Sequence, residues 1–260
     1  MANTIEYGQG AVNNTIGWGQ GAKVGSSFSN TKSITLDGVD DFVDCGDNDN
    51  LSFGDGSADS AFSISAWIKP SAKNFIIMSK DVSGADEYLF YINSDNALSL
   101  VLSDNTISNR RSRNSGNISS NYNNWIHVAA TYNGVGGTNA DNGIKLYLNA
   151  VQVDSGTNNS GSYTAMHNGS APLNIGNYNS SLFASGGIDE TAIFNTELSQ
   201  SDVTAIYGSG VPTSLSSYSS LVSWWRCGDG DTSPTLTDNG SGGNNGTMTN
   251  FSTFSTDVPT

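Results

Sequence analysis

Basic residues are scarce in this chain. Ten Lys and Arg stand against 24 Asp and Glu over 260 residues, which gives a formal net charge of −14 at pH 7. Because a nucleic-acid partner requires a basic face, this charge argues against nucleic-acid binding. Only four of the acidic residues are Glu, and an excess of Asp is typical of turns and of calcium-binding loops.

Cysteines and long apolar runs are scarce as well. The two cysteines, Cys45 and Cys227, are too few for a disulfide framework or a zinc site, and we expect two buried thiols. No apolar run approaches the roughly 18 residues of a membrane span, and the first residues lack the basic and apolar regions of a signal peptide. We therefore expect a soluble chain that is made in the cytosol and does not insert into a membrane.

The chain does contain many short apolar or alternating runs, separated by Gly, Asn, Asp and Ser. From residue 33 onward they lie at 33–36, 42–45, 62–68, 75–79, 88–92, 98–102, 126–132, 144–148, 151–154, 173–176, 188–194 and 221–226. Such runs predict β-strands, and their number and spacing predict an all-β, two-sheet antiparallel sandwich. One short helix is also expected, with Ser199 as its N-cap, Asp202 at its third position and Gly208 at its end.

Residues 1–30 form a separate region with an internal repeat. The sequence NTIEYGQGA at 3–11 recurs eleven residues later as NTIGWGQGA at 14–22. A segment with so few apolar residues cannot fold alone, but Ile5, Tyr7, Ile16 and Trp18 can anchor it to a partner. We expect an extended docking arm. The alternative is a flexible tail, and the repeated aromatic residues favour the arm because a plain linker needs none.

Several segments together resemble the LamG-like jelly roll of the concanavalin A-like lectin/glucanase superfamily. They are ITLDGVDDFV at 34–43, FSISAWI at 62–68, WIHVAATY at 125–132, IKLYLN at 144–149, LNIG at 173–176 and GIDETAIFN at 187–195, followed by the predicted helix. Each piece is short, but the set appears in family order over residues 33–207. The resemblance implies a two-sheet jelly roll.

The segment LVSWWR at 221–226, with DNGSGGNNGT at 238–247, resembles the part that usually opens such a domain, yet it comes last here. Either the order of strands is permuted, or a second, truncated copy begins at this point. We prefer permutation, because too little chain remains for a second domain. We therefore expect one domain over residues 31–260, with 220–251 completing the sandwich and 221–226 beside 42–45.

The repeats before a LamG-like domain are similar to those in structural proteins of marine tailed bacteriophages. This resemblance implies a non-enzymatic virion structural or decoration protein of the capsid, tail or fibre, made in the host cytoplasm. The arm would engage other virion proteins, the domain would face outward, and the chain would form a homo-oligomer in the particle. The alternative is a carbohydrate-binding lectin module of a bacterial surface or secreted protein, with a surface glycan as its partner.

Catalysis is not expected. The glucanases of the superfamily use paired Glu residues on one strand. The only tandem acid that we place on a strand is Asp189-Glu190, whose side chains would alternate to opposite faces, and Glu197 comes too late. His127 lies between apolar residues in a strand, and His167 has no visible partner, so no catalytic set is apparent.

Calcium is one of two interpretations of an acidic turn. Asp37, Asp40 and Asp41 lie together, and the resemblance would place Asp189 near the same end of the sandwich. Carboxylate oxygens suit a structural calcium ion. Alternatively, these side chains cap the Asp-Gly turn by accepting backbone N–H groups. Asp229 and Asp231 form a second candidate.

Carbohydrate binding needs an exposed aromatic ring with polar neighbours. Tyr122, Tyr163, Tyr178 and Phe183 lie in predicted loops rich in Asn and Ser and are our candidates. The alternative is that these rings cover the edges of the sandwich. The fold alone does not decide between a ligand-binding and a structural role. A basic cluster at 110–113 lies in a predicted loop. It either contacts the acidic surface of a neighbouring protein or forms an exposed hairpin tip.

Overall fold

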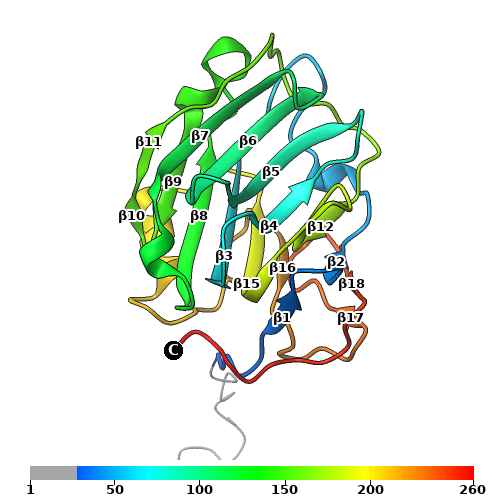
Figure 1. The fold of residues 1–260 in the computed structure, drawn as a ribbon, viewed down its shortest axis with the longest axis vertical. Helices are drawn as coiled ribbons and strands as arrows, with labels where there is room; N and C mark the ends of the chain where they lie inside the picture. The colour runs from blue at the N-terminus through cyan, green and yellow to red at the C-terminus, as the bar shows by residue number, and fades with distance from the viewer. Residues whose placement is uncertain (1–27) are drawn as a thin grey trace, which may run out of the picture.

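The computed structural model describes residues 28–260. The predicted anchors of the arm, Ile5, Tyr7, Ile16 and Trp18, lie outside the described residues, so the docking arm stays a prediction. The described chain forms two large antiparallel sheets that pack face to face (Figure 1). This arrangement confirms the predicted all-β jelly-roll sandwich.

The strands are β1 (Ile34–Asp37), β2 (Phe42–Asp44), β3 (Phe62–Pro70), β4 (Phe75–Lys80), β5 (Asp86–Ile92), β6 (Ala97–Asn105), β7 (Arg110–Asn117), β8 (Ile126–Tyr132), β9 (Ile144–Leu148), β10 (Val151–Gln152), β11 (Asp154–Gly156), β12 (Leu173–Ile175), β13 (Asn177–Tyr178), β14 (Leu182–Phe183), β15 (Ser185–Phe194), β16 (Leu221–Trp225), β17 (Thr235–Leu236) and β18 (Gly246–Thr249). The seven-stranded sheet has the order β1-β15-β3-β8-β9-β10, and β16 also pairs with β15. The nine-stranded sheet has the order β11-β7-β6-β5-β4-β12-β2-β18-β17, and β13 and β14 form a separate hairpin.

Strand β3 shows why the two sheets pack together. Phe62, Ile64 and Ile68 alternate along it and are fully buried between the sheets. The ring of Phe62 stacks on Phe53 at 4.5 Å and lies 5.2 Å from the ring of Tyr88, which comes from the opposite sheet. Because side chains alternate along a strand, this spacing turns one face of β3 into core. Burial of each such side chain stabilises the fold by about 2 kcal/mol.

The α-helix α1 (Gln200–Tyr207) lies on the outer face of the seven-stranded sheet, and three short 3-10 helices are η2 (Asp49–Leu51), η3 (Ser119–Asn121) and η4 (Gly137–Gly143). The Ser199 side chain accepts from the Asp202 backbone N–H, and the Asp202 carboxylate accepts from the Ser199 N–H, so the predicted cap is confirmed. Gly208 ends the helix with φ of 60°. Within residues 28–260, no helix has the length and apolar composition to cross a membrane.

The C-terminal segment contributes strands to both sheets. β16 pairs with β15 in the seven-stranded sheet, with Trp224 opposite Ala192. β18 pairs with β2 in the nine-stranded sheet, with Met248 opposite Val43. In Figure 1 the orange β16 lies next to the yellow β15, and β18 lies beside the blue β2. The expectation that 221–226 lies beside 42–45 is therefore wrong, because 246–249 occupies that place and the two tryptophans pack on the other sheet.

The basic cluster lies on a strand rather than in a loop. Arg110, Arg111 and Arg113 belong to β7, whose polar residues gave no strand pattern. The Arg111 guanidinium donates to the carbonyls of Ser160 and Gly161, and Arg113 lies 3.3 Å from the Asp154 carboxylate. These side chains hold the following loop against the sheet, so the interpretation as a hairpin tip is wrong.

Both cysteines are free and buried, as predicted. Cys45 follows β2, and Cys227 follows β16. Both pack in the main core, where burial raises the pKa of each thiol well above its ordinary value. A thiol held in this neutral form behaves as a small apolar side chain.

Candidate functional site

The predicted ligand-binding aromatics do not form one site. Tyr163 is only 3% exposed, and its hydroxyl donates to the Asp59 carboxylate at 2.7 Å, so it belongs to the core and the prediction is wrong for this residue. Tyr122 is half-buried, and its hydroxyl donates to the Asn96 side chain. Neither ring lies beside the other candidates.

Tyr178 and Phe183 come together on the β13–β14 hairpin, with Asn177 paired to Phe183. Tyr178 packs on a small apolar cluster of Ile76, Leu89 and Val101 outside the nine-stranded sheet. Phe183 lies 6.4 Å from the ring of Phe42. Both rings are half-buried and cover an apolar edge, so a role in ligand binding stays a prediction.

The acidic turn shows the capping contacts. Asp37 Oδ1 accepts the backbone N–H groups of Val39 and Asp40, and Asp41 Oδ2 accepts the N–H of Asp37. The three carboxyl groups still have oxygen atoms within 4.8 Å of one another. Calcium binding here therefore stays a prediction, with one free oxygen on Asp37, one on Asp41 and two on Asp40 among the described contacts.

Asp189 does not belong to this turn. In the pairing of β1 with β15, Asp37 lies opposite Ser185, whereas Ile188 lies opposite Ile34 at the other end of β1. Asp189 therefore lies beyond that far end of β1. Its predicted place in the calcium site is wrong, because the antiparallel register separates it from the turn by about four residues of strand.

An open pocket that the sequence analysis did not identify lies near the end of β16. It has a volume of about 540 Å³, and we call it the tryptophan pocket. Its walls come from the segment before β1, the loop after α1, and β16 with the turns that follow. The lining residues are Phe28, Ser29, Ser214, Ser216, Trp224, Arg226, Asp229, Gly230 and Asn239.

A guanidinium group lies against a pair of stacked aromatic rings in this pocket. The Arg226 Cζ lies 4.6 Å from the ring centre of Phe28 and 5.5 Å from that of Trp224. The two rings are nearly parallel, with centres 6.1 Å apart. Cation–π contacts of this kind contribute about 1 kcal/mol each, so the three side chains stabilise one another in a fixed arrangement.

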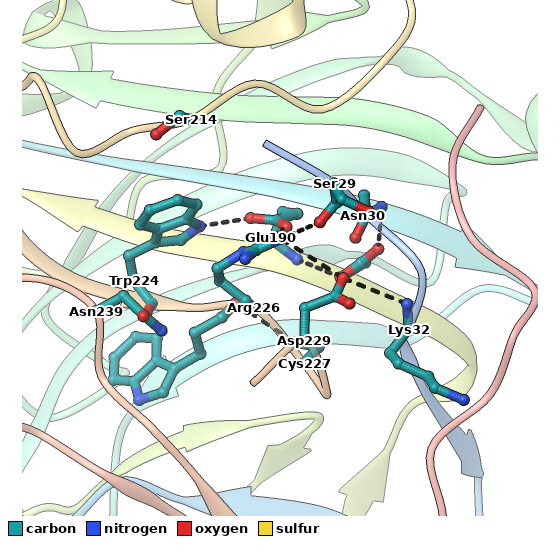
Figure 2. Close-up of polar contacts among 12 residues, drawn as sticks. Ser29, Asn30, Lys32, Glu190, Ser214, Trp224, Arg226, Cys227, Asp229 and Asn239 are labelled. Carbon is teal, nitrogen blue, oxygen red and sulfur yellow. Dashed lines mark hydrogen bonds and ion pairs between the residues drawn. The ribbon is translucent and has the colours of Figure 1, made fainter. Parts of the chain in front are cut away.

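The Glu190 carboxyl lies beside Trp224 and Arg226 and accepts a hydrogen bond from each (Figure 2). Trp224 Nε1–H donates to Oε2 at 2.5 Å, and Arg226 Nε–H donates to Oε1 at 3.3 Å. Glu190 is 4% exposed. Burial raises the pKa of its carboxyl to about 7, and the Arg226 charge opposes the shift. A carboxyl with both oxygens occupied in this way positions its neighbours rather than facing a ligand.

A β-bulge brings Glu190 to this position. The pairing of β15 with β3 shifts between Asp189 and Ala192, and Glu190 has φ of 47°. The expectation that Asp189 and Glu190 simply alternate between opposite faces is therefore wrong, because a bulge interrupts the period of two. Asp189 is fully buried, and its pKa is raised well above the ordinary value, first by burial and then by Glu190.

The segment before β1 is fastened to the same place. Asn30 Nδ2 donates to Asp189 at 2.8 Å, and the Arg226 guanidinium donates to the Ser29 carbonyl. The Asp229 carboxylate accepts the N–H groups of Thr31 and Lys32. Asp229 is thus occupied by protein donors, as is Asp231, which accepts the N–H groups of Gly228 and Thr237.

Polar groups remain free at the wall of the tryptophan pocket. The Asn239 amide donates to the carbonyls of Trp224 and Thr237, which leaves its oxygen as an acceptor among the described contacts. The hydroxyls of Ser214 and Ser216 lie 3.0 Å apart and are exposed. The pocket therefore combines aromatic surface with hydroxyl and amide groups, and the chemistry that it supports is recognition of a polar organic ligand.

Two further carboxyls meet at the turn between β4 and β5. Asp81 and Asp86 are both buried, and the Asp81 Oδ1 atom has no hydrogen-bond partner among the described residues. Burial and the nearby Asp86 raise the pKa of Asp81 to about 8. Asp86 is the first residue of β5 and Glu87 the second, and Glu87 forms a fully buried ion pair with Lys80 at 3.1 Å, so a second tandem acid lies on a strand.

The two histidines have structural contacts. His127 is fully buried, its Nε2 lies 2.8 Å from the Ser65 hydroxyl, and burial lowers its pKa to about 3. His167 does have a partner, because its Nε2 lies 2.9 Å from the Asp104 carboxylate. Neither histidine lines the tryptophan pocket.

Comparison with known proteins agrees with this architecture. The family model described as the concanavalin A-like lectin/glucanases superfamily matches residues 44–204. A protein described as carbohydrate-binding, from Bacteroides ovatus, has a TM-score of 0.57 at 16% identity, covering 89% of this chain and 62% of its own. This chain therefore spans less than two thirds of that protein.

Two other solved structures are less similar. A heptameric SAP-like pentraxin from Limulus polyphemus has a TM-score of 0.39 at 20% identity, covering 65% of this chain and 82% of its own. Domain 4 of an extracellular arabinanase from Geobacillus stearothermophilus, in complex with arabinotriose, has a TM-score of 0.42 at 21% identity. The match covers 59% of this chain and 69% of the arabinanase domain. None of the curated proteins matches this chain.

Proposed function

Because this chain belongs to the concanavalin A-like lectin/glucanases superfamily, we propose that it is a carbohydrate-binding protein and that the tryptophan pocket receives a sugar. The observation that carries the proposal is the wall on which the half-buried ring of Phe28 lies beside Arg226 and Asn239, with the buried Trp224 supporting that ring from within. A pyranose ring has an apolar face of C–H groups and a rim of hydroxyls. Aromatic surface with a few placed polar groups is the lining that such a ligand requires.

The same contacts favour binding over hydrolysis. Glycosidases need two carboxyl groups that flank the bond to be cleaved. Among the residues that line the tryptophan pocket, the only acid is Asp229, and its oxygens accept hydrogen bonds from Thr31 and Lys32. Glu190 is engaged by Trp224 and Arg226. We therefore propose a lectin-like protein without catalytic activity.

A glycan array probed with the full chain tests this proposal, followed by calorimetry on the glycans that bind. Phe28→Ala and Asn239→Ala each remove part of the pocket wall, and we expect each to weaken binding at least about tenfold. Val151→Ala is the matched control, because Val151 is exposed on β10 at the far edge of the sheet. An array without signal, or equal affinity for all variants, would contradict the proposal.

A second proposal concerns the biological setting. The eleven-residue repeat at 3–22 supports a virion structural or decoration protein, with the arm engaging other virion proteins and the lectin-like domain meeting a host-surface glycan. A secreted or cell-surface lectin is the alternative. The two settings differ in what the arm does: deletion of residues 1–27 should abolish incorporation into a particle, but should leave glycan affinity unchanged if the chain is a free lectin.

A further inference from the structure

A second hollow lies where η2, the start of β3 and the segment after β16 meet. Its volume is about 440 Å³, and we call it the amide pocket. The lining residues are Asn50, Ser52, Phe53, Ser60, Ala61, Asn195, Val222, Ser241 and Gly242. It shares no lining residue with the tryptophan pocket.

Charge is absent from this lining. The described residues that form the amide pocket include no Asp, Glu, Lys or Arg, although the chain carries a formal net charge of −14. An anionic ligand would find no counter-charge here and would be repelled by the protein as a whole. An ammonium ligand would find no carboxylate to replace its hydration. The lining therefore suits a neutral ligand.

The lining is also amphipathic. Ala61 supplies partly exposed apolar surface, and the buried Phe53 and Val222 lie behind it; Phe53 is held rigidly because it stacks on Phe62 at 4.5 Å. Ser60 and Asn195 are exposed, and their side chains make no hydrogen bond within the described residues. A ligand that presents C–H groups on one side and hydroxyls on its rim can use both kinds of surface.

One wall of the amide pocket is fixed before any ligand arrives. Asn244 Nδ2 donates to Asn50 Oδ1 at 3.0 Å, and Asn50 Nδ2 donates to the Gly242 carbonyl at 3.2 Å. The Gly242 N–H donates to the Val222 carbonyl oxygen at 2.6 Å. A Cβ atom on Gly242 would lie 2.5 Å from Asn244 Nδ2 and 2.9 Å from the Val222 oxygen, so only glycine fits. A wall ordered in advance reduces the entropic cost of binding.

We propose that the amide pocket is a second sugar-binding site, specific for a neutral pyranose, so that one chain engages two sugars. The inference extends the proposed function and rests on it for the ligand class, but it uses separate residues. Two sites on one rigid domain increase the apparent affinity for a polysaccharide or a glycosylated surface far above that for a free monosaccharide, because the second contact is intramolecular.

Nuclear magnetic resonance of the nitrogen-15-labelled full chain separates the two sites. The probes are the methyl glycosides of glucose, galactose, mannose and N-acetylglucosamine. We expect at least one of them to shift the side-chain amide signals of Asn50 and Asn195 at the amide pocket. Binding at the tryptophan pocket is reported separately by the indole signal of Trp224.

Asn195→Ala should remove the Asn50 shift and leave the Trp224 shift unchanged. Asn139→Ala, an exposed asparagine of η4, is the matched control and should change neither. If only Trp224 responds, the amide pocket is not a site and the proposed function stands. If only Asn50 and Asn195 respond, the amide pocket binds sugar and the role of the tryptophan pocket is overturned. If no probe shifts either set, both proposals fail.

Discussion

The indole N–H of Trp224 donates a hydrogen bond to the carboxyl of Glu190, at 2.5 Å and 34 residues apart. This contact joins the C-terminal strand β16 to the bulge of β15. The family match covers residues 44–204 and so includes Glu190 but not Trp224. Every residue that lines the tryptophan pocket lies outside the matched region, so the family match alone does not assign a ligand to this pocket.

Removal of the Glu190 carboxyl should destabilise the fold strongly. Glu190→Ala leaves the buried Trp224 N–H and the Arg226 guanidinium without their acceptor, which costs about 3 kcal/mol. Glu190→Gln keeps an oxygen acceptor and should cost less than half as much. Urea unfolding followed by tryptophan fluorescence measures both, and equal stability of the Ala variant and the unmodified chain would contradict the assigned role.

Stability should fall as pH rises from about 4 to about 8. The pKa of Asp81 is about 8 in the folded chain, above the ordinary 3.8, and that of Glu190 is about 7. A raised folded-state pKa contributes stability that is fully present below the unfolded value and is lost as pH rises through the folded one. Asp81→Asn should flatten the fall in Tm over this range, whereas Asp95→Asn, in an exposed turn, should not. A pH-independent Tm in the unmodified chain would contradict the raised pKa values of these buried carboxyls.

Calcium should raise the Tm if the turn at Asp37, Asp40 and Asp41 binds it. The free oxygens of three carboxyls suit this ion, and bound ion stabilises the folded state by mass action. We expect a rise of several degrees in millimolar calcium, reversed by chelator and lost in Asp40→Asn. If neither calcium nor chelator changes the Tm, the turn does not bind calcium and its acidic residues serve only to cap the turn.

The helix cap should contribute a measurable share of stability. Ser199→Ala removes one half of the capping box of α1, and such a change costs about 1 kcal/mol. Ser94→Ala, in the exposed turn between β5 and β6, is the control and should be neutral. Chemical denaturation of the three proteins gives the difference, and a neutral Ser199→Ala would show that packing alone holds α1.

Truncation tests the proposed domain limits. Deletion of residues 1–27 keeps every strand of the two described sheets, and we expect it to leave the Tm nearly unchanged. Deletion from residue 220 onward removes β16 and β18 and so exposes β15 and β2. We expect that variant to lose cooperative unfolding, measured by calorimetry. A cooperative transition in the shorter chain would make 220–251 an appendage rather than part of the sandwich.

The sequence predicted the strands well where apolar residues alternate, as along β3, and it predicted α1 from Ser199 and Asp202. It failed for β7, because the residues from Arg110 to Asn117 are nearly all polar and the strand is identified only by its neighbours. It also failed for Tyr163, which looks like a loop residue but packs under Asp59. Local composition does not show where a loop folds back onto the core.

The tryptophan pocket was missed for a related reason. Its residues come from segments near 28, 214, 226 and 239, and no local pattern links them. The bulge at Glu190 has no sequence signal either, since a positive φ at a glutamate is unusual. The pair Trp224-Trp225 followed by Arg226, together with the tandem acid Asp189-Glu190, was the one available hint.

The partition of β16 and β18 between the two sheets also bears on biosynthesis. β2 leaves the ribosome about 200 residues before its neighbour β18 is made. Until then the edge of β2 is open, and an open edge can pair with the strand of another nascent chain. Such long-range pairing also makes folding slow. β18 must therefore be made before the sandwich closes, and aggregation competes with folding during that interval.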